Sequence, residues 1–282
     1  MSKLNWTRAL LQCQQHNQAY VLLTLLGAAG SSPRDHDAKM VVTAEQSYDT
    51  IGGGRLEFDM VKRARELLHN GDYLHEMRSF SLGPSTGQCC GGKVSVLLEV
   101  FPAEPFTLAV FGAGHIAQRL MPLMDELPGR KYWLDSRQDW LDKIHLETTE
   151  KICSSKPVEF IASLPAGFSA LVLTHDHGLD YAIVRALLDR NDTVYVGLIG
   201  SRTKAAKFAS RLRDDGMTPE QIDHLRSPVG LADVPGKLPV EVAVSIAAEL
   251  IQLRYQLIAN RSNSKNTIKR GLSWQQIKGS AS

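Results

Sequence analysis

Apolar residues in the second half of the chain gather in short runs, and each run is followed by a segment in which they recur every three to four positions. Short apolar runs are typical of buried strands, and the second spacing is typical of amphipathic helices. Their alternation predicts a Rossmann-like parallel sheet with helices on its faces. The strands are expected at residues 108–111, 131–134, 151–153, 169–174 and 192–199, and the main helices at 181–188, 204–212 and 240–258.

The first hundred residues do not alternate in this way and predict a mixed α/β module. A proline-punctuated segment, from Pro102 to Pro105, looks like the linker between the two modules. We therefore expect an α/β protein with an N-terminal mixed α/β domain (1–101), a Rossmann-like parallel-sheet domain (107–260) and a basic, mobile tail (261–282). In the first domain, helical spacing occurs at 4–17 and 55–68, and strand patterns occur at 20–26, 39–43, 73–80 and 93–101.

The 282 residues are 43% hydrophobic, and their 32 Lys and Arg against 30 Asp and Glu leave a net charge of +2. A charge this small provides no broad electrostatic surface for nucleic acid or for an anionic membrane. The first residues lack the apolar core of a signal peptide, and the longest apolar run, 20–29, is too short to cross a bilayer. We expect a globular protein of the cytoplasm that binds neither nucleic acid nor a membrane.

Four cysteines, at positions 13, 89, 90 and 153, form no C-x-x-C pair. Their spacing indicates neither a zinc site nor a disulfide framework. Cys89 and Cys90 lie in the glycine-rich segment 83–92, which predicts a loop that is exposed or faces a ligand. A buried structural thiol is the alternative because free cysteine is often buried, but the flanking glycines offer no side chains for packing.

The turn after the first strand of the second module has the spacing of a nucleotide-binding loop. Gly112, Gly114 and Ala117 fit G-x-G-x-x-G/A, in which the first glycine makes the tight turn and the second lets phosphates approach the backbone. Asp135 ends the next strand about 20 residues later, where a ribose-binding acid is expected. The pattern predicts a phosphate site at the start of the helix, beside His115. The alternative is a Rossmann-like domain that keeps the turn and binds nothing.

Three consecutive glycines, Gly52, Gly53 and Gly54, open the helix at 55–68. Glycine loses more freedom on folding than any other residue, so something must need a bare backbone at this point. Two explanations carry equal weight: the close approach of a ligand, and an unusually tight turn between strand and helix.

Polar residues follow the fourth and fifth strands of the second module. His175, Asp176 and His177 follow one strand, and Ser201 and Arg202 follow the other. Because ligands of parallel sheets bind beyond the carboxyl ends of the strands, these are candidate contacts. Consecutive residues of an extended segment cannot all face one point, so a hydrogen-bonding ligand or a partner surface is favoured over a metal ion. For Ser201 and Arg202, an anion cup competes with an ordinary helix start in which Ser201 is the N-cap.

Six short motifs occur in order along the chain. They are Gly-Ser-Ser-Pro-Arg at 30–34, Thr-Ile-Gly-Gly-Gly-Arg-Leu-Glu at 50–57, Gly-Gln-Cys-Cys-Gly-Gly at 87–92, the turn at 112–117, Ser-Pro-Val-Gly-Leu at 227–231 and Pro-Val-Glu-Val-Ala-Val-Ser-Ile at 239–246. In this order they resemble the XdhC/CoxI family, the accessory proteins of xanthine dehydrogenase and related molybdenum hydroxylases. One stretch, 230–237, departs from the family pattern, so the resemblance assigns no contacts to it.

The resemblance implies a chaperone without catalytic residues of its own. Such a protein binds the molybdenum cofactor (molybdopterin) and holds it while a cysteine desulfurase supplies the terminal sulfido ligand. It then delivers the cofactor to apo xanthine dehydrogenase or a related molybdenum hydroxylase. A homodimer is compatible with this role, and so are both the mononucleotide form of the cofactor and a form with an added nucleotide.

The residue types suit this cofactor, which carries a phosphate, a hydrogen-bonding pterin and a sulfur-bound metal. The three glycine-containing turns at 52–54, 112–114 and 200–202 offer amide-lined anion cups. Gln88 and the polar residues at 175–177 offer groups for the pterin edge. Cys89 and Cys90 offer soft thiolates, and we take Cys89 to be the working thiol and a candidate molybdenum contact, with Cys90 more dispensable.

The main alternative is an NAD(P)-dependent oxidoreductase that uses Gly112, Gly114 and Asp135, with His115 or His175 as acid or base. This explains the turn but gives no role to the paired cysteines or to the triple glycine. NAD(P) or another nucleotide as a second ligand of the Rossmann-like domain is compatible with the chaperone as well. A third class, a regulator that binds other proteins, would bind neither cofactor.

Overall fold

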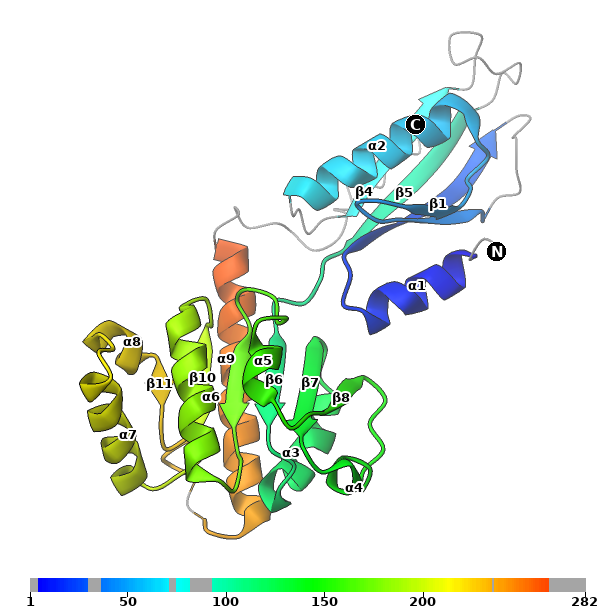
Figure 1. Cartoon of the computed structure of the whole chain (residues 1–282). Coiled ribbons are helices and arrows are strands. Elements are labelled where there is room, and N and C mark those ends of the chain that lie inside the picture. The colour runs from blue at the N-terminus through cyan, green and yellow to red at the C-terminus, as the bar shows by residue number, and fades with distance from the viewer. Residues whose placement is uncertain (1–4, 30–36, 71–74, 82–92, 235, 264–282) are drawn as a thin grey trace. The chain divides into compact units, whose positions relative to one another are not determined.

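The computed structural model describes residues 5–29, 37–70, 75–81, 93–234 and 236–263 (Figure 1). The chain divides into two compact units. One contains the chain up to Ala103 and the residues from Asn260 onward, and the other contains Glu104–Ala259. Each unit has hydrophobic clusters of its own, on both faces of its sheet.

The first unit is a five-stranded antiparallel sheet with strand order β3-β2-β1-β5-β4. Helix α2 packs on one face of the sheet and α1 packs on the other (Figure 1). The elements are α1 (Trp6–Gln15), β1 (Tyr20–Ala29), β2 (Lys39–Val42), β3 (Ser47–Asp49), α2 (Gly54–Asn70), β4 (His75–Ser81) and β5 (Lys93–Phe101).

Alternation along β1 explains why this sheet has a helix on each face. Val21, Leu23 and Leu25 are buried in the core formed with α2, whereas Tyr20 is buried in the cluster formed with α1. Successive strand residues point to opposite faces, so one strand serves both cores. The residues that α2 contributes recur at helical spacing: Leu56, Met60, Ala64 and Leu67.

The second unit is a six-stranded, fully parallel sheet with strand order β11-β10-β9-β6-β7-β8. This is the order of a dinucleotide-binding Rossmann sheet, and it confirms the predicted fold class. The strands are β6 (Thr107–Phe111), β7 (Arg130–Asp135), β8 (Thr149–Cys153), β9 (Ser169–Val172), β10 (Tyr195–Leu198) and β11 (Leu225–Arg226).

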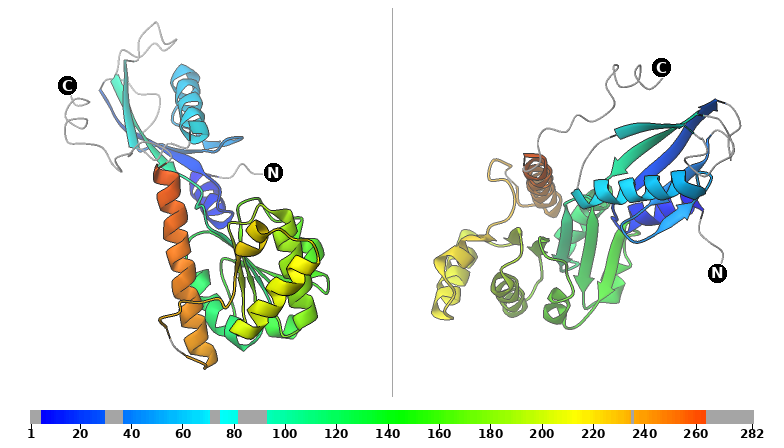
Figure 2. Two further views of the ribbon diagram at one scale, coloured as in Figure 1. Left: turned by 90° about the vertical axis from the view of Figure 1, so that its left-hand side faces the viewer. Right: turned by 90° about the horizontal axis from the view of Figure 1, so that it is seen from above.

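Helices cover both faces of the parallel sheet, as Figure 2 shows. One core joins the sheet to α3, α4 and α9, and the other joins it to α5, α6, α7 and α8. Because both faces are covered, the central strands are apolar almost throughout. The helices are α3 (His115–Asp125), α4 (Gln138–Leu141), α5 (Pro157–Ile161), α6 (His177–Arg190), α7 (Arg202–Asp214), α8 (Pro219–Asp223) and α9 (Pro239–Asn263).

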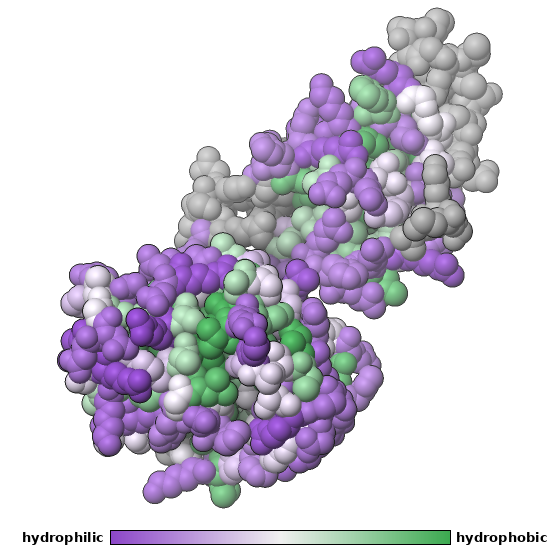
Figure 3. Space-filling model, viewed as in Figure 1, coloured by the Kyte–Doolittle hydropathy of each residue, from purple (hydrophilic) through white to green (hydrophobic). Residues whose placement is uncertain are grey.

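Helix α9 is the one described helix that is long and apolar enough, by length and composition, to cross a membrane, over Pro239–Asn260. Its apolar residues have another explanation, because Ala243, Ile246 and Leu250 are fully buried in the core beside the parallel sheet. On the visible face of the second unit, hydrophilic residues surround a smaller hydrophobic area (Figure 3). The composition of α9 therefore fits a helix that covers a sheet.

Several elements differ from the expected ones at their ends. Helix α6 begins at His177 instead of 181, and α7 begins at Arg202 instead of 204. Both start directly after a capping side chain, which a hydrophobic pattern does not register. Short elements with few apolar residues, β3, α4 and β11, were not expected at all. Helix α9 continues to Asn263, through the first residues assigned to the tail, and 264–282 lie outside the described residues.

Candidate functional site

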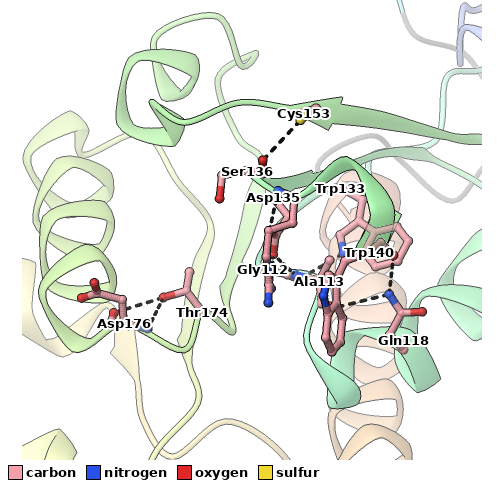
Figure 4. Close-up of polar contacts among 11 residues, drawn as sticks. Gly112, Ala113, Gln118, Trp133, Asp135, Ser136, Trp140, Cys153, Thr174 and Asp176 are labelled. Carbon is pink, nitrogen blue, oxygen red and sulfur yellow. Dashed lines mark hydrogen bonds and ion pairs between the residues drawn. The ribbon is translucent and has the colours of Figure 1, made fainter. Parts of the chain in front are cut away.

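The candidate site lies at the carboxyl end of the parallel sheet, between the loops that follow β6 and β9. From β6 the chain runs outward to β7 and β8, and it returns to place β9 on the other side of β6. In open α/β sheets, ligands bind in the crevice at this reversal. Figure 4 shows the residues around it.

Gly112 is required by its neighbours in the protein. Its φ of +110° is one that side chains rarely adopt, and an added Cβ would lie 2.6 Å from the carbonyl oxygen of Leu173, which follows β9. The Gly112 N–H donates to the Leu134 carbonyl at 2.7 Å, and the indole of Trp133 donates to the Gly112 carbonyl at 3.0 Å. Gly112 thus fits tightly between the strands on both sides of β6.

Gly114 has no such structural requirement. Its backbone is extended, with φ −68° and ψ −177°, and an added Cβ would meet nothing within 4 Å. It is the N-cap of α3, and within the described chain no side chain caps this helix and no acidic residue occupies its first turn. The first N–H groups of α3 therefore keep their capacity to bind an anion.

The carboxylate of Asp135 is already engaged. It accepts the Ala113 N–H at 2.6 Å, and it forms a paired contact with Arg137, in which Nε and Nη2 each lie 2.8 Å from one carboxylate oxygen. Burial raises the pKa of Asp135, but the hydrogen bonds from Arg137 and Ala113 outweigh this and hold the pKa below its usual value. A ribose hydroxyl could reach Asp135 only by displacing one of these donors.

Trp140 of α4 lies beside the glycine turn, and two cationic side chains contact its indole. The guanidinium carbon of Arg137 lies 4.6 Å from a ring centroid of Trp140, and the Lys143 Nζ lies 3.5 Å from a ring centroid of the same side chain. The Gln118 amide donates to the carbonyls of Ala113 (3.1 Å) and Trp140 (2.7 Å), as Figure 4 shows. These bonds fix α4 to the glycine turn.

Asp176, which the sequence suggested as a ligand contact, is the N-cap of α6. Its carboxylate accepts the N–H groups of Gly178 at 2.7 Å and of Leu179 at 3.0 Å. The same N–H groups of Leu179 and Gly178 lower the pKa of Asp176. His175 and His177 flank it and are exposed. His177 is the first residue of α6, so the three residues lie at a helix start and do not continue the strand, which corrects the expectation from the sequence.

A buried ion pair that the sequence did not reveal joins these loops. Asp180 of α6 is fully buried. Its carboxylate accepts hydrogen bonds from the ammonium of Lys204 and from the hydroxyl of Thr174, both at 2.6 Å. Lys204 also donates to the Ile199 carbonyl at 3.0 Å. The network links the segments after β9 and β10, and its members lie too far apart in sequence for a local motif to reveal them.

Ser201 is the N-cap of α7, as the competing interpretation held. Its hydroxyl accepts the Lys204 N–H at 3.2 Å. Arg202 is the first residue of the helix and is exposed. A helix start that already has a side-chain cap offers a ligand fewer open N–H groups than the start of α3.

The triple glycine of the first unit forms a tight turn. Gly52, Gly53 and Gly54 have φ values of 125°, 73° and 69°, which favour glycine at each position. The carboxylate of Glu57, in the first turn of α2, accepts the N–H groups of Ile51 and Gly53, both at 3.1 Å, and the Thr50 hydroxyl. Of the two explanations for the glycines, the backbone turn is the one with structural support, because the protein's own carboxylate occupies these amides.

The four cysteines and Gln88 remain to be placed. Gln88, Cys89 and Cys90 lie outside the described residues. Of the described thiols, Cys13 is buried, which raises its pKa, and Cys153 is exposed at the end of β8, where its Sγ donates to the Ser136 carbonyl at 3.5 Å. Within the described part of the chain, no three His, Cys, Asp or Glu residues gather as they would around a metal ion.

Two curated proteins are similar to this chain. The uncharacterized protein YqeB of Escherichia coli (strain K12) is 27% identical over 248 residues, which cover 86% of this chain and 44% of YqeB. A protein of Bacillus subtilis (strain 168), named as a probable subunit of xanthine dehydrogenase, is 37% identical over 86 residues, which cover 30% of this chain and 23% of that protein. The matched region thus spans less than half the length of either relative.

A solved structure described as a xanthine dehydrogenase from Bacillus halodurans is 22% identical, with a TM-score of 0.47, over 93% of this chain and 98% of that one. Family models give the decisive match. The model of the XdhC and CoxI family covers residues 13–79, and the model of the XdhC Rossmann domain covers residues 108–250, half of the chain. The chain belongs to the XdhC and CoxI family.

Proposed function

We propose that this protein binds the molybdenum cofactor and delivers it to apo xanthine dehydrogenase or a related molybdenum hydroxylase. Two findings support the link to this enzyme class. The chain belongs to the XdhC and CoxI family, and one similar protein is named as a probable subunit of xanthine dehydrogenase. The cofactor brings a sulfur-bound molybdenum centre, a hydrogen-bonding pterin and a phosphate.

The open start of α3 is the observation that carries the proposal. Gly114 has neither a backbone conformation nor a neighbour that requires glycine, and the first turn of α3 has no side-chain cap among the described residues. A missing Cβ at this point is explained by a ligand that approaches the backbone closely. Because helix N-termini favour anions, the phosphate of the cofactor fits here.

Other residues of the crevice would contact the rest of the ligand. His175 and His177 are exposed beside the capped start of α6 and could meet the polar edge of the pterin. Arg202 is exposed at the start of α7 and adds positive charge. The parts proposed for Gln88 and for a thiolate of Cys89 or Cys90 rest on the family resemblance, since these residues lie outside the described ones.

Delivery of the cofactor implies two protein partners, and this chain would not itself turn over a substrate. A cysteine desulfurase would supply the terminal sulfido ligand while the cofactor is held, and the apo-hydroxylase would then receive it. Both steps would take place in the cytoplasm. No catalytic residue is assigned to this chain.

An NAD(P)-dependent oxidoreductase is the competing function, and Asp135 distinguishes the two. A dehydrogenase of this fold uses such a carboxylate for the ribose of NAD. Here the carboxylate is held at 2.8 Å by both nitrogens of the Arg137 fork and accepts the Ala113 N–H. The strand order and the glycine turn suit both NAD(P) and the molybdenum cofactor. Because the Asp135 carboxylate is already hydrogen-bonded, it favours a ligand that does not need this carboxylate.

The test is to purify the full chain from cells that make the cofactor and to measure molybdenum, pterin and nicotinamide in the same sample. We expect molybdenum and pterin in a constant ratio, with no nicotinamide. The control is the same protein from cells in which the cofactor pathway is blocked, which should contain neither. Bound NAD(P), together with oxidation of a substrate, would establish the dehydrogenase instead.

The thiol assignment has its own test in the same preparation. Cys89→Ala should lower the molybdenum content, whereas Cys90→Ala should change it less, because Cys89 is proposed as the working thiol. The two variants are matched, since each removes one sulfur from adjacent positions. Full retention of molybdenum in both variants would remove thiol ligation from the proposal and leave phosphate binding at α3 intact.

A further inference from the structure

A cavity of about 310 Å³ opens beside the glycine turn, on the surface of the second unit. His115, Gln118 and Arg119 line it from α3, and they share one face of that helix because they stand three and four positions apart. Trp140 of α4 and Lys143 also line it. We call this cavity the Trp140 pocket.

The described lining of the Trp140 pocket is basic. Arg119 and Lys143 are exposed cations, and no acidic side chain is among the described residues that line the pocket. Neither cation forms an ion pair within the described ranges. The pocket therefore carries positive charge that the described carboxylates do not neutralise.

Trp140 orients the ammonium group of Lys143 without neutralising its charge. The Lys143 Nζ lies 3.5 Å from the centroid of a Trp140 ring, and the His115 ring meets it edge-on at 5.3 Å. A cation–π contact orients a cation but leaves its full charge for a ligand. Arg137 differs, because its charge is balanced by Asp135. Arg119 and Lys143 are thus the two cations suited to an incoming anion.

The pocket is continuous with the start of α3. His115 is the first residue of that helix and follows Gly114 directly. The positive end of the helix dipole adds to the charge of the pocket, and no acidic residue in the first turn opposes it. The Gln118 amide donates hydrogen bonds to the Ala113 carbonyl of the turn and to the Trp140 carbonyl of the pocket. These bonds hold the glycine turn and the pocket together.

We propose that the Trp140 pocket binds a phosphate or diphosphate group of the ligand that occupies the glycine turn, through Arg119 and Lys143. Guanidinium and ammonium groups are the usual protein partners of phosphate. A volume of about 310 Å³ holds such a group with the atoms next to it. The inference deepens the proposed function and rests on it. The phosphate is either that of the cofactor itself or that of an added nucleotide.

The first test measures anion binding without the cofactor. The full chain, purified free of cofactor, is titrated with inorganic pyrophosphate by calorimetry at constant ionic strength. Arg119→Gln/Lys143→Gln should weaken binding at least about tenfold, because each hydrogen bond to a charged group is worth that much or more. Both residues are exposed, so the variant should unfold at the temperature of the wild-type protein.

A matched control is available on α7. Lys207→Gln/Arg213→Gln removes the same two charges from exposed positions that do not line the pocket. Pyrophosphate binding in this control should equal that of the wild-type protein. An equal loss in both double variants would show general attraction to a basic protein and would overturn the proposal, as would unchanged binding in Arg119→Gln/Lys143→Gln.

The second test identifies the source of the phosphate. The pterin retained by each variant from cofactor-making cells is extracted and its mass is determined. A loss of the plain cofactor from Arg119→Gln/Lys143→Gln assigns the pocket to the cofactor's own phosphate, and a loss confined to a nucleotide-bearing form assigns it to the added nucleotide. Pyrophosphate binding that depends on the two cations, in a chain that purifies without pterin, would contradict the proposed function and support the pocket.

Discussion

Two glycine-rich helix starts, one in each unit, look alike in sequence and differ in what occupies their amides. At 52–54 the Glu57 carboxylate accepts the N–H groups of Ile51 and Gly53, the Thr50 hydroxyl accepts that of Gly52, and all three glycines have positive φ. At 112–114 Gly112 is needed by the sheet, but Gly114 has open space and an ordinary conformation. A glycine at a helix start therefore indicates a ligand only when neither the backbone angle nor a neighbouring atom accounts for it.

Of the substitutions that test this comparison, Gly112→Ala should reduce the stability of the protein most. The new Cβ would lie 2.6 Å from the Leu173 carbonyl oxygen, at a φ of +110°. Strain and overpacking of this kind together cost about 3 kcal/mol or more of unfolding free energy. Urea denaturation of the purified protein measures this loss. A variant as stable as the wild-type protein would show that the turn relaxes easily and that Gly112 is not structural.

Glu57→Ala should have the next largest effect. It leaves the N–H groups of Ile51 and Gly53 without their acceptor, which costs about 2 kcal/mol. Glu57→Gln is the matched control, because its amide oxygen can still accept these bonds, and it should lose clearly less. Urea denaturation reports the free energy, and hydrogen exchange at residues 51 and 53 reports the amides. Unchanged exchange in Glu57→Ala would contradict internal occupation of the turn.

Asp135→Asn should destabilise the second turn by about 1–2 kcal/mol near neutral pH, since hydrogen bonds to a charged acceptor are lost. The pKa of Asp135 is lowered in the folded state. Its contribution to stability is therefore full above the unfolded-state value of about 3.9 and is lost as the pH falls through the folded-state value. Urea denaturation at several pH values should show the wild type and the variant converging in acid, and a constant difference would contradict the assignment.

Gly114→Ala should have the smallest effect on stability, below about 0.5 kcal/mol, because the Cβ meets nothing within 4 Å. Retention of pterin should nevertheless fall, since the methyl group would stand where a phosphate approaches the backbone. The pair Gly112→Ala and Gly114→Ala thus separates folding from binding within three residues. Undiminished pterin retention in a stable Gly114→Ala protein would remove this turn from the proposed site.

The fold was largely predictable from the sequence because its signals are local. The apolar runs that became β5, β6 and β7 lie within one residue of the expected ranges, and Asp135 ends β7 as expected. Helix starts were less predictable. Asp176 caps α6 just before His177, four residues ahead of the expected helix start, and a sequence pattern does not separate a capping carboxylate from a ligand contact.

The candidate site was predictable only in its glycine turn. In the first unit, the glycine turn at 52–54 has three successive positive φ values, and Glu57 accepts a hydrogen bond from it. The spacing of residues in the sequence does not reveal that geometry. Arg137 engages Asp135 from two positions away, which depends on the path of the chain after β7. Arg119 of α3 and Lys143, which follows α4, line the same pocket although they are far apart in sequence, so no local motif reveals the Trp140 pocket.

The buried pair Asp180 and Lys204 restricts how this sequence can change over time. Removing either partner strands an opposite charge in the interior, which is far more costly than exchanging both for apolar residues of similar volume. Related sequences should therefore keep both residues or replace both together. We therefore expect the segments after β9 and β10 to change together, although 24 positions separate the two side chains that join them.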